Sequence, residues 1–530
     1  MRRPKAVLFL AVVVVAALAG AVPGAAKPAP AGPIAVTDRG LVRGAVDDGV
    51  RRFQGIPYAA APVGELRWRS PRPARPWPGV YDATRPRSQC AQPASPVGGV
   101  PSYVEDCLYL NVTTPKRPRR PLPVMVWLHG GSNVSGAGHI YDAGTLASQG
   151  DVVVVTVNYR LGVFGWLAHP AFESGADRAR QAGNYGLLDQ QAALRWVRHN
   201  AVFFGGDPRN VTLFGESAGA LDSCAHLVSP AAAGLFHKAI PQSYSCTDPF
   251  RTEEAAQAEA ARFATALGCA GEPGAADCLR DLPARTLVDR FQSAGMSAVP
   301  VAGGDDLLPR QPREAIERGQ IHRVPVMHGN TLDEMRLFIP LQFPEPISAE
   351  QYAAVVREDF GAAAEEVLAR YPAEAYPSPR IALATVYSDN GTPLSTCQHL
   401  DAYRALAAAG VPVHAYQFAD RTASPLVDVP GYEEGAEHGT ELNYLWPNLL
   451  GPLDGAQRRL SDAMVGYWTS FAHTGTPAAP GAPDWPRFRD SGDVLSLDIG
   501  SGGIRPTDVA RQSHCAFWAD LNRTESSTFG

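Results

Sequence analysis

A serine between two glycines is the residue whose surroundings point most directly to chemistry. Ser217 lies in the run Gly-Glu-Ser-Ala-Gly at 215–219, after a β-branched and apolar stretch at 211–214 and before a helix-forming segment. This order is typical of a nucleophile elbow, a strand-to-helix turn so tight that it needs glycine neighbours. The turn presents the serine hydroxyl beside the free N–H groups of a helix start, which favour negative charge. The sequence therefore predicts that Ser217 is a nucleophile.

A serine nucleophile also needs N–H donors for the oxyanion that forms when it attacks a carbonyl group. The run His129-Gly130-Gly131-Ser132 follows a buried strand pattern and lies upstream of Ser217. Glycines at that place let the backbone fold so that N–H groups point at a carbonyl oxygen, and Ala218 supplies a further N–H. An ordinary glycine-rich turn is the alternative, and the elbow downstream favours an oxyanion hole.

The general base should be a histidine, and an acid that orients it should precede it in the chain. His438 lies in a polar loop, 435–440, beyond a strand pattern, where groups that act in catalysis are often found. Asp333 and Glu334 both follow the strand pattern at 324–327, and pattern alone does not choose between them. The other histidines after residue 300 are His322, His328, His399, His414, His473 and His514.

Strand and helix patterns alternate along the chain, which predicts an α/β fold with a large, mostly parallel central sheet flanked by helices. Four of five strand patterns are continuously apolar, as in strands that are buried on both faces. We find no internal repeat and no linker after Ile34, so one large domain over 27–530 is expected. The strand patterns lie at 124–128, 152–157, 211–214, 324–327 and 413–418, and the helical patterns at 188–200, 253–267 and 460–471.

Composition excludes several classes of function. The net charge of -6 and the pI of about 6.1 give no basic face, so no nucleic-acid partner is expected. The sequence has no C-x-x-C, H-E-x-x-H or P-loop motif, and we expect neither a metal nor a cofactor. Lysine occurs at only four positions, which indicates GC-rich bacterial coding. The oligomeric state is not readable from the sequence.

The N-terminus is typical of an exported protein. Arg2, Arg3 and Lys5 precede an apolar run at 6–22 and the small residues before position 27. This pattern predicts a signal peptide at 1–26 and a secreted protein. An uncleaved membrane anchor is the alternative, and the small residues and the following Ala/Pro-rich tract favour cleavage. An even number of cysteines, eight, predicts disulfides in an exported chain.

Beyond these features, the sequence resembles the type-B carboxylesterase and cholinesterase family over most of its length. The resemblance implies an α/β-hydrolase fold and a serine carboxylesterase that hydrolyses small-molecule esters through an acyl-enzyme, without a cofactor. The runs that carry it are Phe-Gln-Gly-Ile-Pro-Tyr-Ala at 53–59, Glu-Asp-Cys-Leu-Tyr-Leu-Asn at 105–111, Asn-Tyr-Arg-Leu-Gly at 158–162, Asn-Tyr-Gly-Leu-Leu-Asp-Gln at 184–190, Phe-Gly-Gly-Asp-Pro at 204–208, the elbow at 215–220, Tyr-Trp at 467–468 and Cys-Ala-Phe-Trp at 515–518.

The resemblance also assigns the site. The family's acid lies five residues after a strand-end glycine, here Gly329, which implies Glu334 rather than Asp333. Its histidine lies in a Gly-x-x-His-x-x-Glu-Leu pattern, which implies His438. Its oxyanion donors correspond to Gly131, Ser132 and Ala218.

The family's disulfides imply the pairs Cys90–Cys107 and Cys269–Cys278, and the third bridge of cholinesterases corresponds to Cys397–Cys515. The long loop that this third bridge closes would contribute about 4–5 kcal/mol in the chain-entropy model. Cys224 and Cys246 are expected to pair as well, the alternative being two buried thiols.

Three departures from the family pattern matter. Ser132 replaces the usual third glycine, which should leave its backbone N–H donor intact, and Asn133 replaces the usual phenylalanine, which should make that pocket wall more polar. The loop between Cys90 and Cys107 holds no tryptophan, which argues against a choline site. The alternatives are a lipase or an amidase or carbamate hydrolase with the same triad, or a non-catalytic cholinesterase-like adhesion protein.

Overall fold

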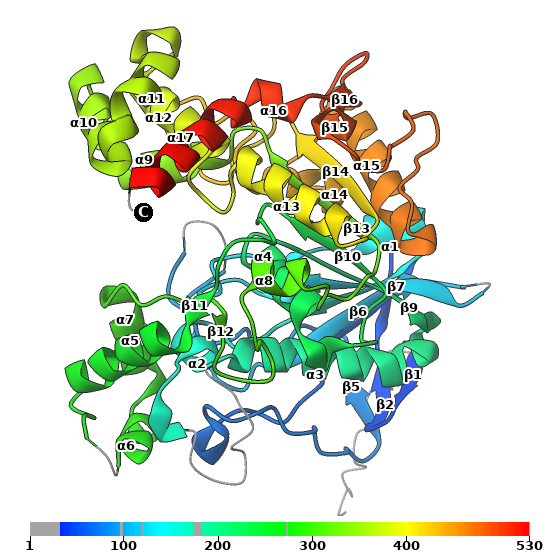
Figure 1. Cartoon of the computed structure of the whole chain (residues 1–530). Helices are drawn as coiled ribbons and strands as arrows, with labels where there is room; N and C mark the ends of the chain where they lie inside the picture. The colour runs from blue at the N-terminus through cyan, green and yellow to red at the C-terminus, as the bar shows by residue number, and fades with distance from the viewer. Residues whose placement is uncertain (1–31, 96–98, 119, 173–182, 272–273, 529–530) are drawn as a thin grey trace, which may run out of the picture. The chain divides into compact units, whose positions relative to one another are not determined.

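The computed structural model describes residues 32–95, 99–118, 120–172, 183–271 and 274–528 (Figure 1). The signal peptide expected at 1–26 lies outside these residues. The chain divides into two units, Met1–Gly32 and Pro33–Gly530, and every helix and strand named below belongs to the second.

A mixed sheet runs through this unit in the strand order β16-β15-β14-β13-β10-β9-β7-β8-β6-β4-β3. The strands from β15 to β8 in that order pair in parallel, and the remaining edge strands pair antiparallel. This confirms the predicted α/β fold with a mostly parallel sheet. The strands are β3 (Ala45–Asp47), β4 (Val50–Pro57), β6 (Tyr109–Pro115), β7 (Leu122–Leu128), β8 (Val153–Val157), β9 (Gly206–Glu216), β10 (Lys238–Gln242), β13 (Val326–Thr331), β14 (Val413–Phe418), β15 (Val494–Leu497) and β16 (Arg505–Thr507).

Helices cover both faces of this sheet, and two small sheets lie apart from it (Figure 1). The small sheets are β1-β2-β5 (Ile34–Thr37, Gly40–Arg43, Val80–Asp82) and β11-β12 (Arg251–Thr252, Val301–Ala302). The helices are α1 (Gly144–Gly150), α2 (Gly162–Trp166), α3 (Tyr185–Asn200), α4 (Ala218–Val228), α5 (Glu253–Ala266), α6 (Ala275–Asp281), α7 (Ala284–Ser293), α8 (Pro312–Glu317), α9 (Phe338–Gln342), α10 (Ala349–Phe360), α11 (Ala364–Arg370), α12 (Pro379–Asp389), α13 (Thr396–Ala408), α14 (Leu442–Leu445), α15 (Gly455–Thr474), α16 (Val509–Gln512) and α17 (Cys515–Thr528).

Strand β7 explains why the strand patterns are continuously apolar. Its residues alternate between two hydrophobic cores: Val124 and Val126 pack in the core that includes α3 and α4, and Met125 and Trp127 pack in the core that includes α15. Every residue of β7 is buried. Because helices cover both faces of the sheet, no position of such a strand faces water.

Helix α15 is longer than its apolar pattern predicts. The pattern covers 460–471, whereas the helix begins at Gly455, directly after Asp454, and ends at Thr474. The Asp454 carboxylate accepts hydrogen bonds from the N–H groups of Ala456 and Gln457, and Gln457 bonds back to the backbone of Asp454. A capping box of this kind extends a helix beyond its buried face.

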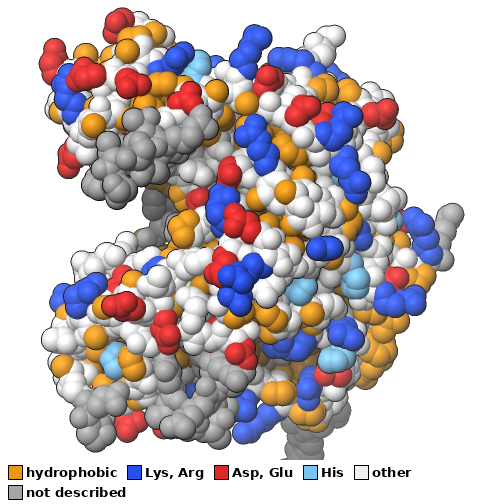
Figure 2. Space-filling view, viewed as in Figure 1, with side chains coloured by type: hydrophobic (Ala, Val, Ile, Leu, Met, Phe, Trp, Pro, Cys, Tyr) orange, Lys and Arg blue, Asp and Glu red, His pale blue; other side chains and the backbone are white. Residues whose placement is uncertain are grey.

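On the face shown in Figure 2, acidic and basic side chains are interspersed.

Four disulfides join the cysteines in the expected pairs. The pairs are Cys90–Cys107, Cys224–Cys246, Cys269–Cys278 and Cys397–Cys515, and no cysteine is left as a free thiol. The second pair joins α4 to the segment after β10. Within the described residues, no helix is long and apolar enough to cross a membrane.

Candidate active site

The turn that holds Ser217 joins the end of β9 to the start of α4. Ser217 has backbone angles φ 56° and ψ −120°. A Cβ on Gly219 would lie 2.0 Å from the carbonyl oxygen of Leu128 on the neighbouring strand, and one on Gly215 would lie 2.5 Å from the carbonyl oxygen of Gly219. No side chain fits at either distance, so both glycines are required by close backbone approach. The sequence prediction of a sharp elbow agrees with this geometry.

His438 and Glu334 lie together although 104 residues separate them. Nδ1 of His438 is 2.6 Å from Oε2 of the fully buried Glu334. The other carboxylate oxygen of Glu334 accepts a hydrogen bond of 2.7 Å from the N–H of Thr331, at the end of β13. Both oxygens therefore have fixed partners, and the histidine ring is held through Nδ1.

The neighbouring carboxylate, Asp333, has different partners. Its oxygens accept hydrogen bonds of 2.8 and 2.9 Å from Arg421 and one of 3.1 Å from the N–H of Ala436. Asp333 thus ties the loop that carries His438 to the end of β13 without touching the imidazole. Between the two acids that pattern alone left open, the structure brings Glu334 to His438.

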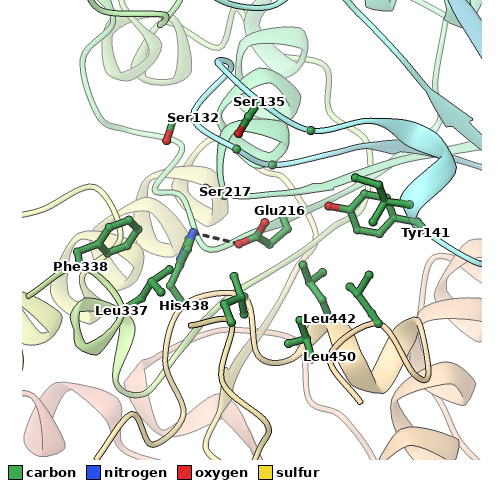
Figure 3. A pocket seen from close by; sticks show the side chains of 17 residues that line it. Ser132, Ser135, Tyr141, Glu216, Ser217, Leu337, Phe338, His438, Leu442 and Leu450 are labelled. Carbon is green, nitrogen blue, oxygen red and sulfur yellow. Dashed lines mark ion pairs between the residues drawn. The ribbon is translucent and has the colours of Figure 1, made fainter. Parts of the chain in front are cut away.

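A second carboxylate approaches the other ring nitrogen. Nε2 of His438 lies 3.0 Å from Oε1 of Glu216, without hydrogen-bond geometry (Figure 3). In the described part of the chain, no hydrogen bond joins Oγ of Ser217 to His438. Such bonds are often long or misaligned in a protein without substrate and tighten when substrate binds. Glu216 was not among the predicted site residues, although its position directly before Ser217 was a usable signal.

Buried carboxylates control the protonation of His438. Burial alone would lower its pKa, but Glu216, Glu334 and Glu441 outweigh that effect and raise the pKa to about 9. Burial also raises the pKa of Glu216 to about 7 and that of Glu441 to about 8. In the sequence, Glu441 is the glutamate of the Gly-x-x-His-x-x-Glu-Leu pattern, and no effect of its charge on His438 was predicted.

These carboxylates determine the expected pH dependence of hydrolysis. Only neutral His438 can accept a proton, so a raised pKa moves the acid limb of the rate profile to higher pH. We expect kcat/KM to rise with pH through a midpoint above about 6.5, the value of an unperturbed imidazole. Glu441→Gln removes one of the charges and should lower that midpoint. Initial rates on an uncharged ester from pH 5 to 10 test this, and a midpoint that stays or rises in Glu441→Gln would contradict it.

The loop after β7 carries two of the predicted oxyanion donors. Gly131 has φ +104°, and Ser132 and Asn133 have φ 55° and 57°. The N–H groups of Val134 and Ser135 donate to the carbonyl oxygen of Gly131 at 2.9 and 3.0 Å, which closes the turn. Among the described residues, no hydrogen bond is donated by the N–H of Gly131, Ser132 or Ala218. All three donors are therefore unpaired within that part of the protein.

Asn133 does not line the pocket, so the expectation of a more polar wall is wrong. The side chain is fully buried, and its Nδ2 donates to Oδ1 of Asp222 on α4 at 3.1 Å. The positive φ of Asn133 turns its side chain into the protein, and sequence comparison alone does not reveal this backbone angle. Ser132 and Ser135 are the hydroxyl-bearing residues of the loop that face the cavity (Figure 3).

Ser217 and His438 line one cavity of about 290 Å³. Gly131 and Ser132 form part of its wall. In Figure 3, Ser132 and Ser135 lie on one side of this cavity, and Leu442 and Leu450 on the opposite side. The apolar part of the wall consists of Ile140, Leu337, Phe338, Leu426, Leu442, Leu449 and Leu450. The cavity therefore suits a ligand with a polar carbonyl group and apolar substituents.

Comparisons with known proteins agree with this geometry. A model of the carboxylesterase family matches residues 31–518. The chain is 36% identical over 491 residues to para-nitrobenzyl esterase of Bacillus subtilis, which covers 88% of this chain and 94% of that protein. It is 34% identical over 509 residues to fumonisin B1 esterase of Sphingopyxis macrogoltabida, covering 90% and 89%. It is also 34% identical over 509 residues to pyrethroid hydrolase Ces2e of Rattus norvegicus, covering 88% and 87%.

The residues that the family model matches include every strand of the large sheet and every residue that lines the cavity, and the relatives carry the names of an esterase or a hydrolase. The chain therefore belongs to the carboxylesterase family of α/β-hydrolases and is a carboxylic ester hydrolase.

Proposed function

We propose that the protein is a secreted serine carboxylesterase that hydrolyses uncharged, apolar esters with Ser217, His438 and Glu334 as its triad. The observation that carries this proposal is the 2.6 Å contact between His438 and Glu334 at the cavity that Ser217 lines. A histidine held through Nδ1 by a buried carboxylate keeps Nε2 for proton transfer, which is the arrangement that a serine nucleophile requires. Nε2 of His438 makes no hydrogen bond to Glu216, although Oε1 of that residue lies 3.0 Å away.

In the proposed reaction, Oγ of Ser217 attacks the ester carbonyl carbon and Nε2 of His438 takes the hydroxyl proton. The N–H groups of Gly131, Ser132 and Ala218 stabilise the oxyanion. The bond to the alcohol oxygen then breaks, and His438 protonates the departing alcohol. Water, deprotonated by His438, then attacks the acyl carbon. The bond from that carbon to Oγ of Ser217 breaks, His438 returns the proton to Oγ, and the acid is released. Glu334 stabilises the imidazolium at both stages.

The apolar wall supports an ester with hydrophobic acyl or alcohol groups as substrate. The wall residues are leucines, an isoleucine and a phenylalanine, and the ionisable side chains on the cavity are Tyr141, Glu216 and His438. Relatives named for para-nitrobenzyl ester, fumonisin B1 and pyrethroid hydrolysis share this chemistry of ester cleavage. Apolar groups gain about 25 cal/mol per Å² on entering such a wall.

Rates on p-nitrophenyl esters from acetate to palmitate test the proposal. We expect an optimum at short or medium acyl chains, because the apolar wall of this cavity of about 290 Å³ covers such chains more completely than it covers a palmitoyl chain. An aryl phosphonate should inactivate the enzyme, and mass spectrometry should locate its adduct on Ser217. An optimum at palmitate with higher rates on emulsions would indicate a lipase. No ester hydrolysis by folded protein would redirect the search to amides and carbamates.

Secretion is part of the same proposal. It is supported by the charged and apolar start of the sequence and by four disulfides, which persist in oxidising compartments. Expression of the full chain in a secreting bacterial host should release protein that begins near residue 27. N-terminal sequencing of protein from the culture medium checks the cleavage position, and protein that stays membrane-bound with an intact N-terminus would show an anchor instead.

A further inference from the structure

The buried amide of Asn133 and the buried carboxylate of Asp222 form a contact between two parts of the active site. Nδ2 of Asn133 donates to Oδ1 of Asp222 at 3.1 Å, and neither side chain is accessible to solvent. Asn133 directly follows Ser132 in the loop after β7. Asp222 lies one turn into α4, whose first residue is Ala218.

Asp222 is held by amides rather than by a cation. Its Oδ2 accepts a hydrogen bond of 2.5 Å from Nε2 of Gln190 on α3, and Oε1 of Gln190 accepts one of 2.8 Å from Nε2 of His226. Burial raises the pKa of Asp222 to about 7. Burying a carboxyl group without a cation costs free energy, and an apolar residue at 222 would avoid that cost. The buried position of Asp222 therefore points to a specific role for its hydrogen bonds.

The position of this contact suggests the role. The proposed oxyanion hole takes donors from two elements: Gly131 and Ser132 from the loop, and Ala218 from α4. Among the described residues, the bond from Asn133 to Asp222 is the one hydrogen bond that joins loop residues 130–136 to α4. The loop also holds two consecutive non-glycine residues at positive φ, a conformation that persists only when its surroundings fix it.

We propose that Asn133 and Asp222 are a positioning pair that sets the separation of the N–H groups of Ser132 and Ala218. The pair touches no substrate and acts through the backbone of its neighbours. Gln190 orients the Asp222 carboxylate so that its other oxygen faces Asn133. This inference rests on the proposed serine mechanism, because it concerns the oxyanion hole of that mechanism.

A reciprocal exchange of the two side chains tests the pair. Asn133→Asp alone would face one carboxylate with another, and Asp222→Asn alone would leave an amide that can accept from only one of its two donors. In the double variant N133D/D222N, the new amide at 222 can still accept from Gln190 and can donate to the new carboxylate at 133. The donor–acceptor pairing is thus restored with its direction reversed and with the net charge unchanged.

We expect each single variant to lower kcat about 10- to 100-fold with KM changed less than threefold, because a misplaced oxyanion donor weakens transition-state binding more than substrate binding. The double variant should recover at least tenfold over the weaker single variant. The burst of p-nitrophenol at the start of the reaction counts functional enzyme, so kcat is compared per folded site. Losses that multiply in the double variant, with no recovery, would overturn the proposal.

Two further variants separate positioning from folding. Asn133→Gly keeps a residue that accepts φ 57° and removes only the amide, so it should fold and still lose kcat. Gln191→Met breaks a similar buried bond, from Gln191 Nε2 to Ser229 Oγ, at the far end of α4, and should lower the Tm without lowering kcat. Full kcat in Asn133→Gly would refute the pair. If the wild type hydrolyses esters without a phosphonate adduct at Ser217, the serine mechanism itself fails and not the pair.

Discussion

Ser217→Ala is expected to lower kcat about 10⁶-fold, the loss typical of removing the nucleophile from a serine triad. The reason is that the remaining groups cannot form an acyl-enzyme, and His438 and the N–H donors retain only their weak action on direct attack by water. Alanine at 217 keeps the backbone N–H groups and removes a single oxygen atom, so the fold should be unaffected. Steady-state rates on p-nitrophenyl butyrate measure the effect, together with loss of the initial burst.

The comparison needs protein that is folded to the same extent. The Tm of Ser217→Ala should lie within a few degrees of the wild type, since a small substitution away from the packed core changes stability little. A loss of activity smaller than tenfold in such protein would remove Ser217 from the nucleophile role.

Glu334→Gln is expected to lower kcat on the order of 10⁴-fold, the scale seen when a triad acid becomes an amide. The structure gives the reason. The N–H of Thr331 donates to Oε1 of Glu334, so the carbonyl oxygen of a glutamine would face Thr331 and its NH₂ group would face Nδ1 of His438. The imidazole would then carry its proton on Nε2, where it cannot accept one from Ser217. Rates should fall at every pH between 6 and 10.

Asp333→Asn is the matched control for this change. The two residues are adjacent, and the same oxygen-to-nitrogen exchange at 333 weakens bonds to Arg421 and to the backbone of Ala436 without reaching His438. We expect a lower Tm and a kcat within tenfold of the wild type. Equal losses of kcat in the two variants would show that the loop position, rather than the histidine tautomer, controls the rate.

The fold could be predicted from local patterns because the two hydrophobic cores, one on each face of the sheet, require apolar residues at neighbouring positions of the same strand. A continuously apolar strand such as β7 indicates burial on both faces of the sheet. The glycines around Ser217 indicate close approach of the backbone. Both features arise in any fold in which helices cover the two faces of a parallel sheet. Helix α15 was predicted too short because its first turn is set by the Asp454 cap and not by buried apolar side chains.

The site residues that were not predicted depend on contacts between residues that lie far apart in the sequence. Glu216 and Glu441 look like ordinary acids in the sequence, and only the fold places both of them near His438. Asn133 was predicted to line the pocket because it replaces the phenylalanine that is usual in the family. Its φ and its partner Asp222, 89 residues away, decide where its side chain points, and neither is visible in a local pattern.

The contact between Asn133 and Asp222 also limits which segments of this enzyme can be exchanged with those of its relatives. A loop transplanted from a relative with the usual phenylalanine would bring a large apolar ring against a buried carboxylate, and a transplanted helix α4 without Asp222 would leave an amide with no acceptor. Libraries that recombine the two segments freely should therefore be depleted in active clones, whereas crossovers that keep residues 130–136 and 218–223 from one parent should preserve activity.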